Sequence, residues 1–310
     1  MMFSILIPTW NNLPYLKLCI QSIRDHSCED HEILVHVNEG SDGSIPWLEN
    51  QGIKYTHSRK NIGICMAVNL LAGMATNDWL LYLNDDMVCC PGWDSTLINT
   101  IEEAQDDRLF LSSMLLEPAP TGNDRVIVQN HGHGPHDFDE TGLLKHYMDA
   151  ERSDMLGRAS QPTLVSKRWW TMVGGYSLEF SPGMSSDDDL LMKLWVAGFR
   201  RFEILSQSRL YHFACRSTGR IRKNRGSREF ALKWGITQGE FMRNYLSAGY
   251  CDKTNSFNSK CVPKPTPSGR LKRAFHGLFS DIPLGDIAAW EDLPGEIFPS
   301  PSKPDSRQTN

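Results

Sequence analysis

The stretch YLNDDMVCCPGW (Tyr82–Trp93) is the most informative part of the chain for its fold and function, because two adjacent acids end an apolar run there. The preceding DWLLYL is apolar along most of its length, as in a strand buried on both faces. Neighbouring carboxylates repel each other and are costly to bury unless something compensates. Asp85 and Asp86 therefore indicate either a polar turn or a cation shared with an anionic ligand.

Short apolar segments alternate with helical patterns on both sides of this stretch. Strands are predicted at residues 3–8, 31–37, 53–57 and 78–83, and helices at residues 13–23, 45–51 and 62–75. Strands that are apolar throughout and alternate with helices predict the α/β class, with a mostly parallel sheet flanked by helices. Ligands are then expected at the carboxyl ends of the strands, where Asp85 and Asp86 lie.

The second half of the chain repeats this pattern less regularly. We expect strands at TLVS, RFEIL and RLYHF, helices at SKRWWTMVGGY, SSDDDLLMKLWVAGFR and about residues 229–246, and a basic lid at residues 216–228. A single domain is predicted over residues 1–249. The extension over residues 250–310 is rich in Pro, Ser and charge, so we expect it to be partly disordered. Within it, RLKRAFHGLF predicts a small basic amphipathic helix that contacts a membrane or the domain body.

Composition limits the class of protein. The chain has 310 residues, of which 40% are hydrophobic, and a formal net charge of -5, which argues against a general nucleic-acid binder. Its eight cysteines show no CxxC pair, a pattern typical of reduced thiols in the cytoplasm. The N-terminus does not read as a signal peptide, and no apolar run approaches the ~20 residues of a membrane span. We therefore expect a cytoplasmic protein with at most a peripheral membrane contact.

Four polar clusters fall on predicted strand ends or helix starts. They are Asn38–Asp42, Asn84–Asp86, Asp187–Asp189 and His212. Taken singly, each has an ordinary explanation as a turn, a helix cap or a structural histidine. Placed together on one edge of a parallel sheet, they indicate a binding site.

Six segments in order resemble the family 2 glycosyltransferases of the GT-A fold. They are SILIPTWNN, EILVHVNEGSDGS, RKNIGICMAVN, YLNDDMVCCPGW, SSDDDLLMKLWVAG and YHFACRST, and the resemblance covers residues 3–217. It implies a Rossmann-like GT-A domain that moves a sugar, with inversion, from a nucleotide-diphosphate donor to an acceptor hydroxyl. A UDP-sugar is the favoured donor. A glycan or a lipid-linked saccharide is the expected acceptor, in a hexosyltransferase-like step of glycan or polysaccharide assembly.

The resemblance also assigns roles to residues. It implies Mn²⁺ or Mg²⁺, held by Asp86 with His212 as a further ligand, to neutralise the diphosphate leaving group. The positions that match nucleotide-binding residues are Pro8, Thr9, Asn11, Glu39, Arg59, Asn61, Gly63, Asn84 and Asp85. Aligning DDDL with the family's EDxDL makes Asp187 the first choice for the catalytic base and Asp188 the second.

Two alternatives stay open from the residues. A nucleotidyltransferase would share the sheet and the metal, but should carry a Gly-rich basic loop after the first strand, whereas PTWNNLPYL has neither Gly nor Arg. A catalytically inactive nucleotide-sugar-binding protein is the other alternative. It is kept open by Asn38, Asn84 and Ser186, which stand where the family commonly has acids.

Overall fold

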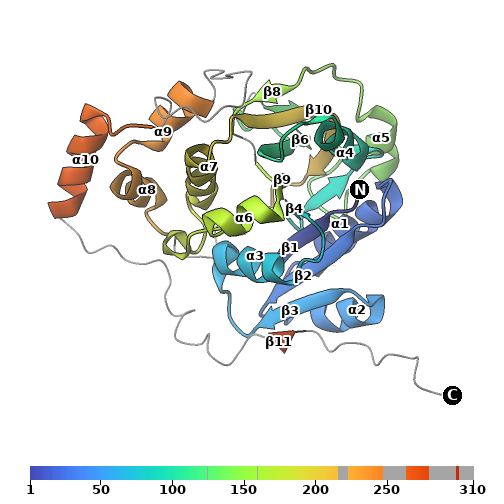
Figure 1. Ribbon diagram of the computed structural model, residues 1–310. Coiled ribbons are helices and arrows are strands. Elements are labelled where there is room, and N and C mark those ends of the chain that lie inside the picture. The colour runs from blue at the N-terminus through green and yellow to red at the C-terminus, as the bar shows by residue number, and fades with distance from the viewer. Residues whose placement is uncertain (124, 159, 216–222, 247–262, 279–297, 300–310) are drawn as a thin grey trace.

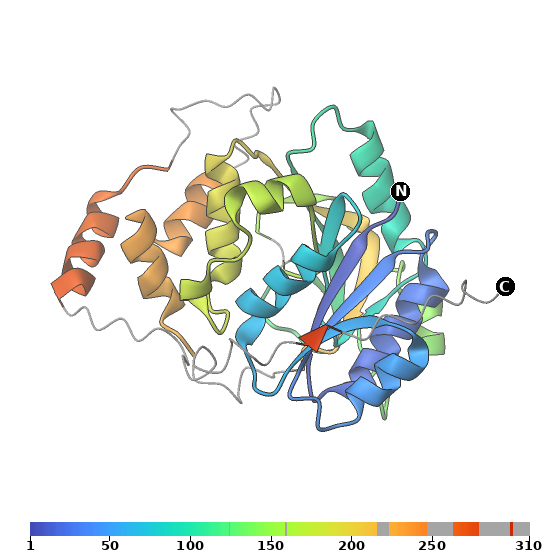
Figure 2. The ribbon, with the colours of Figure 1, turned by 60° about the horizontal axis from the view of Figure 1, so that its bottom comes forward.

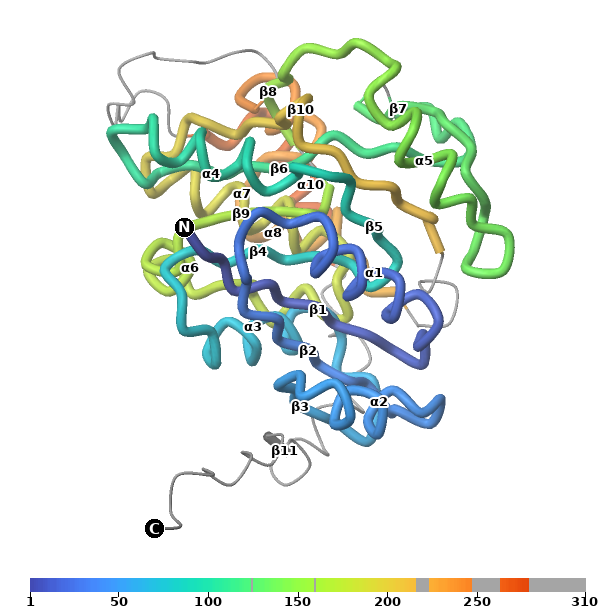
Figure 3. Tube along the Cα trace, turned by 90° about the vertical axis from the view of Figure 1, so that its right-hand side faces the viewer, coloured from blue at the N-terminus to red at the C-terminus, as the bar shows by residue number. Residues whose placement is uncertain are grey.

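A large mixed sheet runs through the computed structural model, which describes residues 1–123, 125–158, 160–215, 223–246, 263–278 and 298–299 (Figure 1). Its strand order is β11-β3-β2-β1-β4-β9-β6-β10-β5, with β7 beside β6 and β8 beside β10. Figure 3 shows these strands stacked from β10 at the top to β3 below. The strands are β1 (Ser4–Trp10), β2 (Glu32–Asn38), β3 (Lys54–Ser58), β4 (Trp79–Tyr82), β5 (Met87–Cys89), β6 (Leu109–Glu117), β7 (Val126–Val128), β8 (Met155–Leu156), β9 (Thr163–Ser166), β10 (Arg201–His212) and β11 (Phe298–Pro299).

Helices cover both faces of the sheet, which confirms the predicted α/β class (Figure 2). One face carries α1 (Leu13–His26), α2 (Ser44–Gln51) and α4 (Trp93–Glu103), which share a buried apolar core with β1 and β2. The other carries α3 (Gly63–Met74), α6 (Lys167–Val173) and α7 (Ser186–Val196). The remaining helical segments are α5 (Glu140–His146), η1 (Leu178–Phe180), α8 (Gly226–Trp234), α9 (Gln238–Phe241), η3 (Met242–Leu246) and α10 (Pro267–Leu278).

The sheet is less parallel than the apolar strands suggested. β1, β2, β3 and β4 are parallel neighbours, and so are β6 and β10. Between these two parallel groups β9 pairs antiparallel with both β4 and β6, and β5 pairs antiparallel with β10. A strand buried on both faces is apolar in either direction, so its composition does not reveal its orientation.

Two predicted elements have different boundaries in the structure. RFEIL and RLYHF form one strand, β10, whose register against β6 shifts between Leu205 and Arg209. The predicted helix over residues 229–246 is broken after Trp234, because Gly235 ends α8 in a left-handed conformation (φ +68°). The part of the predicted lid at residues 216–222 lies outside the described residues, as does most of the predicted disorder after residue 250.

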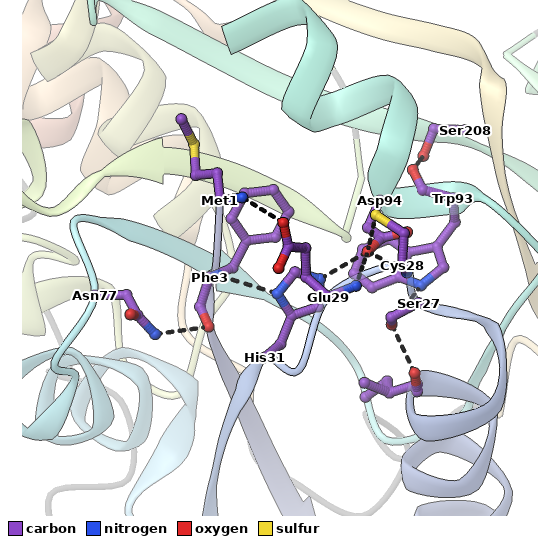
Figure 4. A network of polar contacts seen from close by, with 11 residues as sticks. Met1, Phe3, Ser27, Cys28, Glu29, His31, Asn77, Trp93, Asp94 and Ser208 are labelled. Atoms are coloured by element: carbon purple, nitrogen blue, oxygen red, sulfur yellow. Dashed lines mark hydrogen bonds and ion pairs between the residues drawn. The ribbon is translucent and has the colours of Figure 1, made fainter. Parts of the chain in front are cut away.

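A buried hydrogen-bond network fastens the start of β2 to α4 (Figure 4). His31 Nδ1 accepts a hydrogen bond from the backbone N–H of Phe3 at 3.0 Å, and His31 Nε2 lies 3.0 Å from Asp94 Oδ2. The same carboxylate oxygen accepts the backbone N–H groups of Cys28 and Glu29. Because Asp94 is fully buried, these donors compensate its desolvation and tie the loop after α1 to α4.

The helices that the structure describes include none with the length and apolar character to cross a bilayer. Within the predicted C-terminal extension, α10 packs on α8, and β11 pairs antiparallel with the edge strand β3.

Candidate functional site

A cleft of about 510 Å³ lies at the carboxyl ends of β1, β2 and β4. Eight of the predicted ligand-binding residues line it, namely Pro8, Thr9, Asn61, Gly63, Asn84, Asp85, Asp86 and His212. Asn11, Glu39 and Arg59 are not among its described lining residues. Asn11 and Glu39 bond to each other just beyond β1 and β2, with Asn11 Nδ2 3.0 Å from Glu39 Oε2. Arg59 is exposed after β3. The strand ends therefore converge as predicted, although not every matched position enters the cleft.

The two adjacent acids of the opening stretch have different partners. Asp85 Oδ2 accepts the hydroxyl of Thr9 at 2.6 Å, so the end of β4 is tied to the end of β1. Asp86 is buried, and its Oδ2 accepts the backbone N–H of Cys215 at 2.8 Å. Asp85 thus lies at the junction of two parallel strands, while Asp86 faces β10.

Asp86, His212 and Glu117 form a line of charged groups on one side of the cleft. His212 Nε2 lies 3.5 Å from Asp86 Oδ1, and His212 Nδ1 lies 2.8 Å from Glu117 Oε1. Burial alone would lower the pKa of the imidazole. The hydrogen bonds and charges of Asp86 and Glu117 outweigh burial and raise the pKa of His212 to about 9. The two carboxylates therefore favour a positive charge at this place, which either a proton on His212 or a bound cation can supply.

The chemistry of this cluster suits a divalent cation, although its protein ligands are few. No three His, Cys, Asp or Glu side chains converge on one point in the described part of the chain. Two atoms that each bind one ion at about 2.1 Å lie about 3.0–3.6 Å apart, a range that includes the Asp86–His212 separation of 3.5 Å. Glu117 Oε2 is also buried without a hydrogen-bond partner among the described residues. Such ions keep water and phosphate oxygens in their remaining positions, so Asp86 and His212 fit as the protein ligands, and the imidazole suits Mn²⁺ better than Mg²⁺.

Gly63 lets α3 begin close to the neighbouring loop beside the cleft. Its φ is +76°, and a Cβ on it would lie 2.9 Å from Pro182 Cα. The side chain of Asn61 accepts the N–H of Gly63 at 2.8 Å, and the next N–H, of Ile64, bonds to the Pro182 carbonyl. The position therefore requires glycine both for its backbone conformation and for space.

Replacing Gly63 with alanine is expected to destabilise the protein by about 1–2 kcal/mol from the left-handed backbone alone, with the contact to Pro182 adding to the loss. The matched control is Gly73→Ala in the same helix, where an added Cβ meets nothing within 4 Å. That change should stabilise α3 by about 0.5–1 kcal/mol. Urea unfolding of both variants measures the difference. Equal effects of the two substitutions would show that the conformation of Gly63 is unimportant.

The first turn of α7 places Asp187 beside the cleft. Asp187 Oδ1 accepts the Tyr176 hydroxyl at 2.7 Å and the Gln161 amide at 3.1 Å. Tyr176 stacks edge-on against Tyr82, which lines the cleft. Within the described part of the chain, both side-chain hydrogen bonds to Asp187 reach Oδ1. Oδ2 accepts no side-chain hydrogen bond among the described residues.

The other two aspartates of this turn are held more tightly. Asp188 is buried, bonds to Gln238, and lies 2.7 Å from Arg158 Nε without hydrogen-bond alignment. Burial raises the pKa of Asp188, Arg158 opposes the rise, and the charge of Asp187 adds to it. Asp189 is fully buried and accepts hydrogen bonds from Ser177 and Trp234, the contacts of a structural residue.

A second cavity, of about 1310 Å³, lies on the other side of the α7 start. It runs between α7, α8 and α10, and Asp188 is part of its lining. Apart from Asp188, the Asp, Glu, Lys and Arg side chains of its lining are all basic: Arg158, Lys223, Arg225, Arg228, Arg243 and Lys272. Met184 lines both this basic cavity and the cleft at the strand ends. The two spaces therefore adjoin at the residues that precede Asp187.

Several residues of this site were missed from the sequence. Glu117 had a usable signal, because it is an acid at the carboxyl end of the buried strand β6. The sequence carried no signal for the residues whose roles depend on tertiary contacts with α7. These are Tyr176, Gln161 and Arg158.

Sequence comparison finds relatives among sugar transferases. Residues 4–148 match the family described as glycosyl transferase family 2. Polypeptide N-acetylgalactosaminyltransferase 15 of Mus musculus is 24% identical over 251 residues, which are 75% of this chain and 38% of the relative. A PGL/p-HBAD biosynthesis glycosyltransferase of Mycobacterium tuberculosis is 32% identical over 90 residues, which are 27% of this chain and 35% of the relative. The chain thus matches less than two fifths of the length of these curated relatives.

Structural comparison supports the predicted fold. S. aureus TarS 1-349 superposes with a TM-score of 0.55 at 14% identity, over 90% of this chain and 73% of that one. GalNAc-T7 with UDP, GalNAc and Mn²⁺ superposes with a TM-score of 0.57 at 13% identity, over 92% of this chain and 58% of that one. At such identities the likeness concerns the fold, and it confirms the GT-A arrangement of sheet and helices.

Proposed function

We propose that the chain, whose residues 4–148 match glycosyl transferase family 2, transfers a sugar from a UDP-sugar to an acceptor hydroxyl, with inversion and with the help of Mn²⁺ or Mg²⁺. UDP and UDP-GlcNAc complexes of TarS, and the UDP and Mn²⁺ bound to GalNAc-T7, support the choice of donor and ion. The acceptor proposed is a glycan or lipid-linked saccharide of a polysaccharide pathway. Residues 1–249 are the proposed catalytic domain, and residues 250–310 its extension.

One observation carries this proposal: a cleft that contains an acid–imidazole pair adjoins a separate carboxylate at the carboxyl edge of the sheet. Asp86 and His212 lie in the cleft, and Asp187 lies beside it behind Tyr82 and Tyr176. Acid and imidazole ligands suit a cation that binds a diphosphate, and a separate carboxylate suits the removal of a proton. The described cysteines are free thiols, which supports a cytoplasmic setting.

Donor binding is assigned to residues at the ends of β1 and β4. Asp86 and His212 would hold the ion, which when bound neutralises negative charge on the diphosphate. Thr9 and Asp85 line the cleft where β1 and β4 end, and a 2.6 Å hydrogen bond holds the two side chains together. Gly63 and Asn61 bring the start of α3 to the cleft, so its backbone approaches the nucleotide closely.

Proton removal is assigned to Asp187. The acceptor oxygen forms a bond to the anomeric carbon while the bond to the diphosphate oxygen breaks, and the diphosphate leaves with that electron pair. The acceptor proton moves to Asp187 Oδ2, while Tyr176 and Gln161 hold Oδ1 in place. Attack opposite the leaving group gives inversion at the anomeric carbon.

Metal-dependent nucleotide binding tests the donor half of this proposal. UDP at about 100 times its Kd, with Mn²⁺, is expected to stabilise the folded chain by about 2.7 kcal/mol, seen as a higher Tm. Asp86→Asn should lose the Mn²⁺-dependent part of that shift, because it removes a charged ligand. Asp85→Asn is the matched neighbour and should keep most of it, since Asp85 is engaged with Thr9.

Donor turnover tests the chemistry separately. UDP release from a panel of UDP-sugars, with and without candidate acceptors, should occur with the wild-type chain and require Mn²⁺ or Mg²⁺. Binding of nucleotide without release from any donor would instead identify a nucleotide-sugar-binding protein. Equal UDP shifts in Mn²⁺ and in a chelator would refute the metal requirement.

A further inference from the structure

An apolar stripe on α10 is largely exposed to solvent, and part of it borders the basic cavity. Leu271, Phe275 and Leu278 have exposed fractions of 73%, 59% and 80%. At about 100° per residue, their spacing of four and three positions places them within about 60° of one another around the helix. Large apolar side chains gathered in this way on a surface helix are typical of an interaction site.

The opposite side of α10 is fastened to the domain, which fixes the direction of the stripe. Gly269 is buried so closely on Gly235 that a Cβ would lie 2.2 Å from the Gly235 carbonyl oxygen. The His276 carbonyl accepts a hydrogen bond from Arg228 Nη2 at 2.9 Å, which also ties this part of the helix to α8. In Figures 1 and 2, α10 lies at the outer edge of the molecule, beyond α8.

Positive charge flanks this stripe. Residues 264–278 contain four Lys or Arg side chains and no Asp or Glu, in a chain of net charge -5. Arg270 and Lys272 precede and follow Leu271, so they lie about 100° to either side of it on the helix. An apolar stripe bordered by cations is the pattern of a helix that lies in the interface of an anionic bilayer.

We propose that α10 docks the protein on an anionic lipid bilayer. The apolar stripe enters the interface, while Arg270 and Lys272 contact acidic headgroups. Leu271 and Phe275 also line the basic cavity that leads to Asp188. If the chain is the sugar transferase proposed above, docking places the mouth of this cavity at the membrane surface, where a lipid-linked acceptor would be presented.

Vesicle flotation with the full-length chain tests this proposal. Binding is expected to vesicles of equal parts phosphatidylcholine and phosphatidylglycerol, but not to phosphatidylcholine alone, and should weaken as salt is raised. The double variant Arg270→Gln with Lys272→Gln should partition about 30-fold less onto the anionic vesicles. The triple variant Leu271→Ser, Phe275→Ser and Leu278→Ser should lose binding. Met172→Ser, on α6, removes an apolar side chain that is 64% exposed and should bind like the wild type.

Three results would overturn docking: full binding by the triple variant, equal binding to neutral vesicles, or a dimer in sedimentation velocity that only the triple variant abolishes. The last would mean that a second copy covers the stripe. A thermal shift with UDP and Mn²⁺ that the triple variant retains shows that it is folded. Absence of that shift in the wild-type chain would count against the donor proposal and leave the flotation result to stand by itself.

Discussion

Asp187→Asn is expected to lower kcat by about 10²- to 10⁴-fold, the usual contribution of a general base. Asparagine keeps the shape of the side chain and still accepts the Tyr176 hydroxyl through its amide oxygen, but it cannot take the acceptor proton. Asp187 is not part of the described cleft lining, so the Kd for UDP should be unchanged. Single-turnover transfer and UDP titration measure the two effects separately.

Asp188→Asn is the matched comparison, because it alters the adjacent carboxylate by the same atoms. Asp188 is buried against Arg158 and Gln238, so its substitution should slow transfer less than that of Asp187. The variant at Asp187 should also lose the acidic limb of the pH–rate profile, because that limb reports the base. A larger loss at Asp188, with the limb retained at Asp187, would reverse the assignment.

Asp94→Ala is expected to destabilise the fold by at least about 1–3 kcal/mol, the cost of a buried donor left without its acceptor. The substitution leaves His31 Nε2 and the N–H groups of Cys28 and Glu29 without their buried acceptor. Urea unfolding at neutral pH measures the loss. Asp149→Ala removes a carboxylate that is 62% exposed from a surface pair with His146 and should change stability by no more than about 0.5 kcal/mol.

The contribution of Asp94 should also depend on pH. Burial opposes its ionisation, but the hydrogen bonds from His31 and Cys28 outweigh burial and hold the pKa of Asp94 below its ordinary value of 3.8. A folded pKa below the unfolded one means that the stabilisation is complete above the unfolded pKa. It disappears as the pH falls through the lower folded pKa. The difference between wild type and Asp94→Ala should therefore shrink in acid, and a difference independent of pH would contradict the paired carboxylate.

The order of strands and helices could be predicted because burial leaves a direct pattern in the sequence. β1, β2 and β4 read as apolar runs, and their carboxyl ends meet as the parallel arrangement requires. The direction of β9 could not be predicted, since its four buried residues would suit either orientation. The sequence did not indicate that β10 is one continuous strand, because its central residues are polar. In the structure the register shifts there, and Ser206 and Ser208 are buried.

The site was predictable where the chain itself brings residues to a strand end. Asp85, Asp86 and His212 belong to this class, and all three line the cleft. Partners that approach from separate segments left no local pattern. Arg158 reaches Asp188 from a loop, and Gln238 reaches it from α9.

The first turn of α7 holds three identical side chains in three different surroundings. Asp187 meets a tyrosine hydroxyl, Asp188 meets a guanidinium at the basic cavity, and Asp189 is locked under Trp234. We therefore expect the three aspartates to differ in function although their side chains are identical. A library confined to these three adjacent codons should sort variants by turnover, by acceptor preference and by heat tolerance, which makes this turn an efficient place to begin directed evolution of the proposed activity.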